Sequence, residues 1–314
     1  MTEADGQPSF GDRVADAVAE RRSQLVLGLD PNLARLWPGA ARLAEAAARS
    51  SAIPAERAAR AVAAHCALAL EAVAEQCVAV KPQVACFERL GPPGWLALVE
   101  VVDRALDLGL LVIADAKRGD IDVTASAYAE AFFGVSDTPY GPVASVGADA
   151  LTVNPLLGGD SIAPLLERAR EHGGGLFVLV RTSNRGAADV QDLELTGGET
   201  VSDRLAEIVA RLGESGIGAS GLSDVGAVVG ATVPERLEAL RTRMPRTIFL
   251  LPGVGAQGAT VEKLGPAFAP GRAGGLVAVS RGIVDAHLQT GADPAEAARA
   301  QAEALRDALW STAA

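Results

Sequence analysis

Cysteine, histidine and positive charge are all scarce in this chain, and each shortage argues against a class of protein. The 314 residues include three cysteines and three histidines, and the formal net charge is −11. Three cysteines without a CxxC pair fit a reducing compartment better than a disulfide framework. Three scattered histidines disfavour a metal site and a histidine-based catalytic triad. An acidic chain also lacks the basic surface that nucleic-acid binding requires.

Long apolar runs and a signal peptide are missing as well. No apolar run reaches the ~20 residues that span a bilayer. The N-terminal stretch MTEADGQPSFGDR is polar and acidic, unlike a secretory signal. We therefore expect a cytoplasmic protein that binds neither membrane nor nucleic acid. A small anionic ligand is not excluded, because a local group of lysine and arginine can oppose the overall charge.

The chain is rich in short apolar runs that alternate with alanine-rich helical patterns. Each run is apolar almost to its end, as in parallel strands that are buried on both faces. We predict eight strands, at 24–30, 77–83, 110–117, 150–155, 176–183, 224–231, 247–255 and 275–283. Helical patterns lie between them, for example at 55–75, 94–109 and 233–244.

Eight strands with intervening helices and no linker predict a single (β/α)₈ TIM barrel that spans residues 1–314. About ten N-terminal residues are expected to be flexible. A doubly wound open sheet is the alternative, and the lack of a GxGxxG motif after the first strand counts against it. The polar segment 184–200 is long enough to form a lid over a site.

Polar or glycine residues follow every predicted strand, and the carboxyl ends of the strands carry the active site in a TIM barrel. The candidate positions are Asp30, Lys81, Asp115, Lys117, Asn154, Ser183, Gln257 and Arg281.

The stretch LVIADAKRGDI (111–121) places several charges behind a buried strand. Asp115 and Lys117 are two apart and share a face of that strand. Asp120 lies past the strand, and its spacing of four from Thr124 would put both on one face of the next helix. Taken alone, such a run is more often a solvated, salt-bridged turn. Lys81 also ends an apolar run, and lysines and aspartates around one barrel mouth are costly unless they neutralise one another. Such a network would aim an ammonium group at a carbanion or a proton acceptor.

A second group of residues follows the last two predicted strands. The glycine-rich turn PGVGAQG (252–258) can direct backbone N–H groups at an anion, with Gln257 as a further donor. Arg281 ends the last strand, and the neighbouring Gly282 allows close backbone approach. Either segment alone would be an ordinary turn. Together they favour a phosphate pocket, which is common at this place in such barrels.

Five motifs carry a resemblance to a known family. LGLDP, AVKPQ, DAKRGDI, PGVGAQG and VSRGI occur in this order between residues 24 and 283. The chain thereby resembles the orotidine 5′-phosphate decarboxylase family, in its longer bacterial branch, with extra residues near 31–54 and 184–224. It departs from the commoner IPNT wording by reading IDVT, although Thr124 keeps the threonine place.

The resemblance implies a carbon–carbon lyase that converts orotidine 5′-monophosphate to UMP and CO₂ in the last step of pyrimidine nucleotide synthesis, without metal or organic cofactor. Lys117 would stabilise and protonate the C6 carbanion, held in place by Asp115, Lys81 and Asp120. The implied binding residues are Asp30 and Lys81 for the ribose, Ser183 for the pyrimidine, and Gln257, Arg281 and Gly282 for the phosphate. The resemblance also implies a homodimer in which Asp120 and Thr124 enter the partner's site.

Three alternatives share these features. A Mg²⁺-dependent decarboxylase or synthase of sugar phosphates would need further carboxylate ligands at strand ends. The second strand ends in Lys81, Pro82 and Gln83 without an acid, which favours metal-free chemistry. A Schiff-base aldolase could use Lys117 or Lys81 as its nucleophile. A catalytically silent phosphate-binding barrel would bind nucleotide without turnover.

Overall fold

Eight parallel strands close into a barrel in the computed structural model, which describes residues 8–48, 53–255 and 258–313. Around the barrel the order is β1, β10, β9, β8, β7, β6, β3, β2. The strands are β1 (Leu25–Leu29), β2 (Ala79–Pro82), β3 (Leu111–Arg118), β6 (Ala150–Val153), β7 (Gly175–Arg181), β8 (Val225–Val229), β9 (Phe249–Pro252) and β10 (Gly275–Val279). Each lies within or overlaps one predicted run, so the predicted TIM barrel is confirmed.

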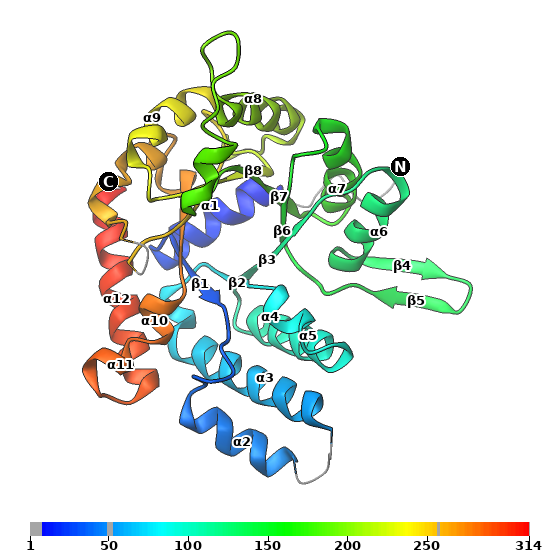
Figure 1. The fold of residues 1–314 in the computed structure, drawn as a ribbon, viewed down its shortest axis with the longest axis vertical. Helices are drawn as coiled ribbons and strands as arrows, with labels where there is room; N and C mark the ends of the chain where they lie inside the picture. Colours follow the sequence, from blue (N-terminus) through cyan, green and yellow to red (C-terminus); the bar gives the residue numbers. More distant parts are fainter. Residues whose placement is uncertain (1–7, 49–52, 256–257, 314) are drawn as a thin grey trace.

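Helices surround the barrel (Figure 1). The longer ones are α2 (Pro38–Ala48), α3 (Pro54–Val73), α5 (Pro92–Asp107), α6 (Asp122–Phe132), α7 (Gly159–Glu171), α8 (Val201–Gly213), α9 (Pro234–Arg243) and α12 (Pro294–Thr312). Short helices are α4 (Ala85–Glu88), α10 (Arg281–Val284) and α11 (His287–Thr290). Helix α8 begins with a capping box formed by Thr200 and Asp203. No helix in the described ranges has the length and apolarity to cross a bilayer.

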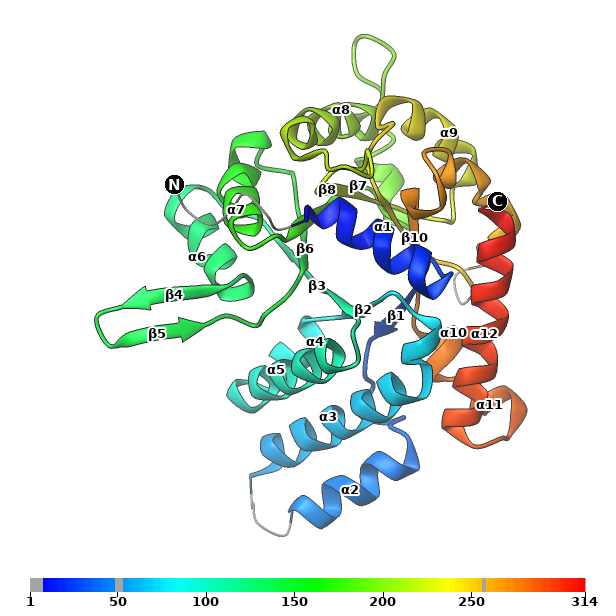
Figure 2. The same ribbon diagram turned by 180° about the vertical axis from the view of Figure 1, so that it is seen from behind.

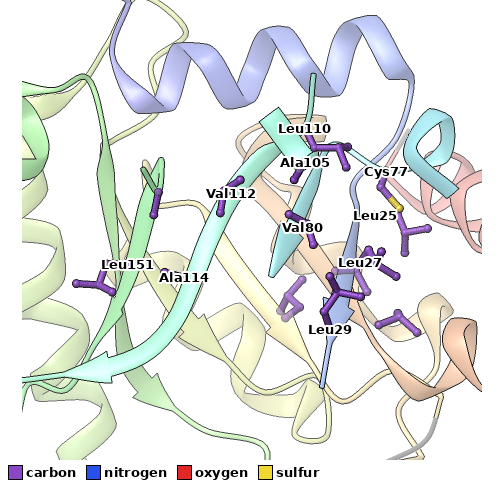
Figure 3. Close-up of a cluster of buried hydrophobic side chains, with 14 of the residues drawn as sticks. Leu25, Leu27, Leu29, Cys77, Val80, Ala105, Leu110, Val112, Ala114 and Leu151 are labelled. Carbon is purple, nitrogen blue, oxygen red and sulfur yellow. The ribbon is translucent and has the colours of Figure 1, made fainter. Parts of the chain in front are cut away.

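Alternate residues of each strand face opposite sides of the barrel wall, and this period of two separates two apolar clusters. The outer cluster lies between strands and helices (Figure 3) and includes Leu25, Leu27, Leu29, Val80, Val112 and Leu151. The inner cluster fills the barrel and includes Val26, Ala79, Ile113, Ala150, Phe177 and Leu250. Two residues further along their strands, the same inward face carries Gly28, Lys81, Asp115 and Thr152. Polar groups therefore form the top layer of an otherwise apolar barrel interior.

Helix α1 (Phe10–Arg21) lies across the amino-terminal end of the barrel, as Figure 2 shows. Phe10, Val14 and Val18 join the inner cluster, and the Phe10 ring meets the edge of Phe177 with ring centroids 5.9 Å apart. The sequence did not predict this helix. The helix begins at Phe10, which is the last of the ten or so N-terminal residues that were expected to be flexible, and Phe10 is buried.

A second unpredicted element is the antiparallel hairpin β4 (Val135–Thr138) and β5 (Gly141–Ala144). It projects away from the barrel next to α6 and α7 (Figures 1 and 2). Its residues are half-buried or exposed, and Pro139 and Pro142 interrupt the run. The hairpin therefore lacks the apolar character by which the barrel strands were recognised. The predicted insertions contain α2 near 31–54, and α8 with the 3₁₀ helix η3 (Arg185–Asp189) near 184–224.

Candidate active site

The carboxylate of Asp115 is the centre of the polar layer at the carboxyl end of the barrel. Its Oδ1 accepts hydrogen bonds from Lys117 Nζ at 2.5 Å and Thr152 Oγ1 at 3.0 Å. Its Oδ2 accepts from Lys81 Nζ at 2.6 Å and Gln83 Nε2 at 3.1 Å. A carboxylate offers about four acceptor sites. Donors from β2, β3, β6 and the residue after β2 therefore fix this group from all sides.

The charges in this cluster stabilise one another. Burial opposes ionisation of Asp115, but the ammonium groups of Lys81 and Lys117 outweigh it and hold the pKa of Asp115 well below its usual range. Burial likewise disfavours the charged form of Lys81, yet Asp115 and Asp30 raise the pKa of Lys81 above its usual value. Asp115 and Lys81 are therefore both charged at neutral pH. The predicted contact of Asp115 with two lysines is present.

Lys117 is the outward member of the cluster, with 44% of its side chain exposed, whereas the side chain of Lys81 is 10% exposed. Lys117 borders a cavity of about 350 Å³ together with Lys81, Asp115 and Thr152. Apolar side chains and the loop after β7 complete the lining, through Leu179, Thr182, Ser183, Asn184, Gln191, Val228, Leu250 and Pro252. The larger cavity can hold a small ring with polar edges against an ammonium group.

A smaller cavity of about 90 Å³ shares Lys81 and Pro252 with the larger one. It extends toward β1 and β10 and is lined by Gly28, Asp30, Gly253, Val254, Ala278, Ser280, Arg281 and Gly282. A Cβ on Gly28 would lie 2.8 Å from that of Ser280, so only glycine lets these strands approach so closely here. The two cavities form one elongated site with Lys117 at one end and Arg281 at the other. This arrangement suits a ligand with anionic groups at both ends.

The loop after β7 is anchored by a buried arginine. Arg181 donates to both carboxylate oxygens of Asp192, at 2.7 and 2.8 Å, and to the carbonyl of Thr182. Gln191 accepts a hydrogen bond from the backbone N–H of Thr182 at 2.8 Å. Part of the predicted lid at 184–200 therefore borders the larger cavity, while its stretch from 193 to 198 is exposed.

Seven of the predicted site residues line these two cavities, namely Asp30, Lys81, Asp115, Lys117, Ser183, Arg281 and Gly282. Gln257 lies outside the described residues. Asn154 follows β6 and caps a turn by accepting from the backbone N–H of Leu156.

Asp120 and Thr124 border neither of these cavities. Asp120 is half-buried and accepts a hydrogen bond from the backbone N–H of its neighbour Ile121, at 2.8 Å. Thr124 is exposed on α6. The prediction that Asp120 and Thr124 share one face of a helix is wrong, because α6 begins at Asp122, after Asp120.

Gln83, Thr152 and Gln191 are site residues that the sequence interpretation missed. Gln83 follows Lys81 by two positions, so the strand period could have identified it. Thr152 is the one polar residue in the buried strand ALTV, which is a weaker signal. For Gln191 no local pattern indicates the site, since its place depends on how the loop after β7 folds back.

None of the three histidines lines either of the two cavities. His65 accepts a hydrogen bond from the backbone N–H of Trp37, and burial lowers its pKa to about 4, so it is neutral at pH 7. In the part of the chain that the structure describes, no three His, Cys, Asp or Glu residues are grouped so that they could hold a metal ion.

The barrel carries a lysine–aspartate cluster and an arginine-lined pocket at the carboxyl ends of its strands. These features define the protein as an enzyme of the TIM-barrel class. The sequence profile described as "Orotidine 5'-phosphate decarboxylase / HUMPS family" matches residues 23–301. The chain therefore belongs to this family, as the five motifs predicted.

Individual relatives are similar to this chain along nearly its full length. The orotidine 5′-phosphate decarboxylase of Deinococcus radiodurans is 42% identical, over 96% of this chain and 97% of its own. That of Herpetosiphon aurantiacus is 36% identical, over 94% and 96%. The solved structure of Leishmania donovani OMP decarboxylase has a TM-score of 0.71 at 33% identity, covering 97% of this chain and 98% of its own. The predicted enzyme class, a carbon–carbon lyase, is confirmed.

Proposed function

We propose that this protein converts orotidine 5′-monophosphate to UMP and CO₂ in pyrimidine nucleotide synthesis, without a metal ion or organic cofactor, and that Lys117 is the catalytic cation and acid. The relatives named above support the reaction. The observation that carries the mechanism is the ammonium group of Lys117, held by Asp115 at the border of the larger cavity.

The difficult step is the loss of CO₂ from C6 of the pyrimidine. The C6–carboxylate bond breaks, and its electron pair stays in the ring plane, where the π system cannot absorb it. A fixed cation beside C6 stabilises this charge most effectively when it is already in position. Lys117 then transfers a proton from Nζ to C6 and regains one from water. Asp115, whose other oxygen binds Lys81, holds the ammonium group of Lys117 in position.

In this proposal the rest of the nucleotide occupies the two cavities. The pyrimidine occupies the larger cavity with Ser183 at its edge, and the ribose lies where Asp30 and Lys81 meet. The phosphate binds at the smaller cavity, next to Arg281 and Gly282. Because the phosphate is remote from C6, its binding energy can hold the ring against Lys117 and close the loop after β7 over a drier site.

A second copy of the chain completes the site in this proposal, through Asp120 and Thr124. Both lie where β3 runs into α6, and the backbone N–H of Asn154 donates to the carbonyl of Arg118 at 2.7 Å, which joins this segment to the loop after β6. Exposed apolar side chains lie next to them in the sequence, namely Ile121 (51% exposed) and Val123 (83%), and on the loop after β6, namely Leu156 (80%) and Leu157 (52%). Such a patch at a barrel mouth suits an isologous interface that would bring Asp120 to the partner's Lys117.

An ultraviolet assay with excess EDTA tests the reaction and its independence of metal. The expected result is loss of orotidine 5′-monophosphate, with UMP as product, at the same rate with and without EDTA. Activity that EDTA removes and Mg²⁺ restores would support the metal-dependent alternative. Folded protein that binds UMP but shows no turnover would contradict the proposed function and favour a silent phosphate-binding barrel.

Arg281→Ala should weaken substrate binding through the phosphate. The side chain is exposed at the smaller cavity, so the fold should be unaffected. Loss of a charge-assisted contact predicts a fall in kcat/KM equivalent to about 2–3 kcal/mol of transition-state stabilisation, with KM raised and kcat lowered. Added guanidinium should restore part of the activity.

Arg204→Ala is the matched control, since Arg204 is an exposed arginine on α8 that pairs with Glu207. It should leave the kinetics unchanged. An Arg281 variant with the kcat/KM of the unaltered enzyme would place the phosphate elsewhere.

A further inference from the structure

The seam between β3 and β6 is irregular beside the catalytic cluster. Ile113 pairs with Ala150 and Ala114 with Leu151, but the next pair is Arg118 with Val153. Residues 115–117 of β3 therefore lie opposite the single residue Thr152. A bulge of this kind leaves backbone groups without their ladder partners and redirects the side chains that it carries. The side chains redirected here are those of Asp115 and Lys117.

The hydroxyl of Thr152 fills the gap in this ladder. Thr152 Oγ1 accepts a hydrogen bond from the backbone N–H of Lys117 at 2.9 Å and donates one to Asp115 Oδ1 at 3.0 Å. One hydroxyl can do both, because it has one proton and two lone pairs. Thr152 is 1% exposed, so water cannot readily replace it. The backbone of Lys117 and the carboxylate that binds its ammonium group are thus joined through one atom.

The backbone of Lys117 needs such a support. Its φ is +48°, in the left-handed region, which costs a residue with a Cβ about 1–2 kcal/mol. Two other non-glycine residues of the described chain share this feature, and both lie at helix ends: Arg22 after α1 and Asp122 at the start of α6. Lys117 alone among the three lies within a strand. A strained conformation at one functional residue persists only if its surroundings enforce it.

We propose that Thr152 is a positioning residue that sets the place of the Lys117 ammonium group. This inference rests on the proposed catalytic role of Lys117. Without the hydroxyl, the N–H of Lys117 loses its acceptor and the backbone can relax toward an extended conformation. A displacement of about 1 Å at a reacting group can cost ~10²-fold in rate. The proposed ribose and phosphate contacts come from Asp30, Lys81 and Arg281, none of which bonds to Thr152, so nucleotide affinity should change little.

Three variants separate the hydroxyl from the shape of the side chain. Thr152→Val keeps the volume but removes the hydroxyl, Thr152→Ala removes both hydroxyl and methyl, and Thr152→Ser removes the methyl alone. We expect kcat to fall by about 10- to 100-fold in the valine and alanine variants. KM and the Kd for UMP should stay within about threefold in both. The serine variant should recover most of kcat.

Thr247→Val is the control for loss of a buried threonine hydroxyl at a distance from the site. Thr247 is 2% exposed and lies just before β9, at the opposite end of the barrel. It should leave kcat unchanged.

Either of two results would overturn the role of Thr152. One is a wild-type kcat in both Thr152→Val and Thr152→Ala. The other is a serine variant as impaired as the alanine variant, because the methyl group would then be the determinant. Lys117→Ala, measured in the same assay, distinguishes this failure from that of the proposed function. If Lys117→Ala is inactive while Thr152→Val is unaffected, Lys117 keeps its role and Thr152 loses its own.

Discussion

Lys117→Ala is expected to lower the turnover of orotidine 5′-monophosphate by about 10⁴-fold or more, with UMP binding retained. Two functions are lost together, because the same ammonium group stabilises the carbanion and supplies the proton. Removing one preorganised electrostatic group typically costs ~10²–10³-fold, and removing a general acid ~10²–10⁴-fold. Single-turnover assays with excess enzyme, beside calorimetric titration with UMP, measure the two effects separately.

The fold should survive this substitution. The Lys117 side chain is 44% exposed, so its ion pair adds little to stability. Asp115 also keeps Lys81, Gln83 and Thr152 as donors, and therefore no buried charge is left unpaired. The unfolding temperature should accordingly stay close to that of the unaltered protein.

The chain offers a strict control, since it contains only three lysines. Lys263 is exposed and lines neither cavity, so Lys263→Ala should keep full activity. Substantial turnover by Lys117→Ala would instead make Lys81 the candidate acid. If borohydride then trapped substrate on Lys81, the reaction would proceed through a Schiff base.

The barrel and most of the site could be predicted because they depend on local patterns. An apolar strand buried on both faces is visible in the sequence, and its period of two already puts Asp115 and Lys117 on one face. The order of strands in a closed barrel then brings Lys81 on β2 beside Asp115 on β3. Neither step needs the exact register between the strands.

The remaining parts depend on geometry that sequence patterns do not contain. Thr152 reaches Lys117 only because β3 bulges at residues 115–117, and a bulge leaves no mark in an apolar run. The start of α6 at Asp122 depends on the turn after β3, which made the spacing of Asp120 and Thr124 misleading. Helix α1 is amphipathic, but it directly follows a polar N-terminal stretch. The sequence therefore did not indicate that this helix covers the amino-terminal end of the barrel.

Asp120 could act in the site of its own subunit or in that of the partner subunit, and an experiment can distinguish the two. Its carboxylate is half-buried, and it forms no ion pair with Lys117 in the described part of the chain. If a partner's Asp120 approaches Lys117, the two halves of the DAKRGD motif serve different sites. Asp120→Ala should then be severely impaired, because Lys117 would lose a second carboxylate that holds it in place.

Mixing inactive Lys117→Ala and Asp120→Ala proteins under conditions of subunit exchange should restore activity. Random pairing makes half of the dimers mixed, and each mixed dimer would have one intact site of two, so activity should reach about a quarter of that of the unaltered enzyme. An affinity tag on one variant reports how much mixed dimer has formed. As a control, Lys117→Ala mixed with the double variant Lys117→Ala/Asp120→Ala should stay inactive, since no subunit then supplies Lys117. Mixed dimers that form but remain as inactive as their parents would place the action of Asp120 within its own chain.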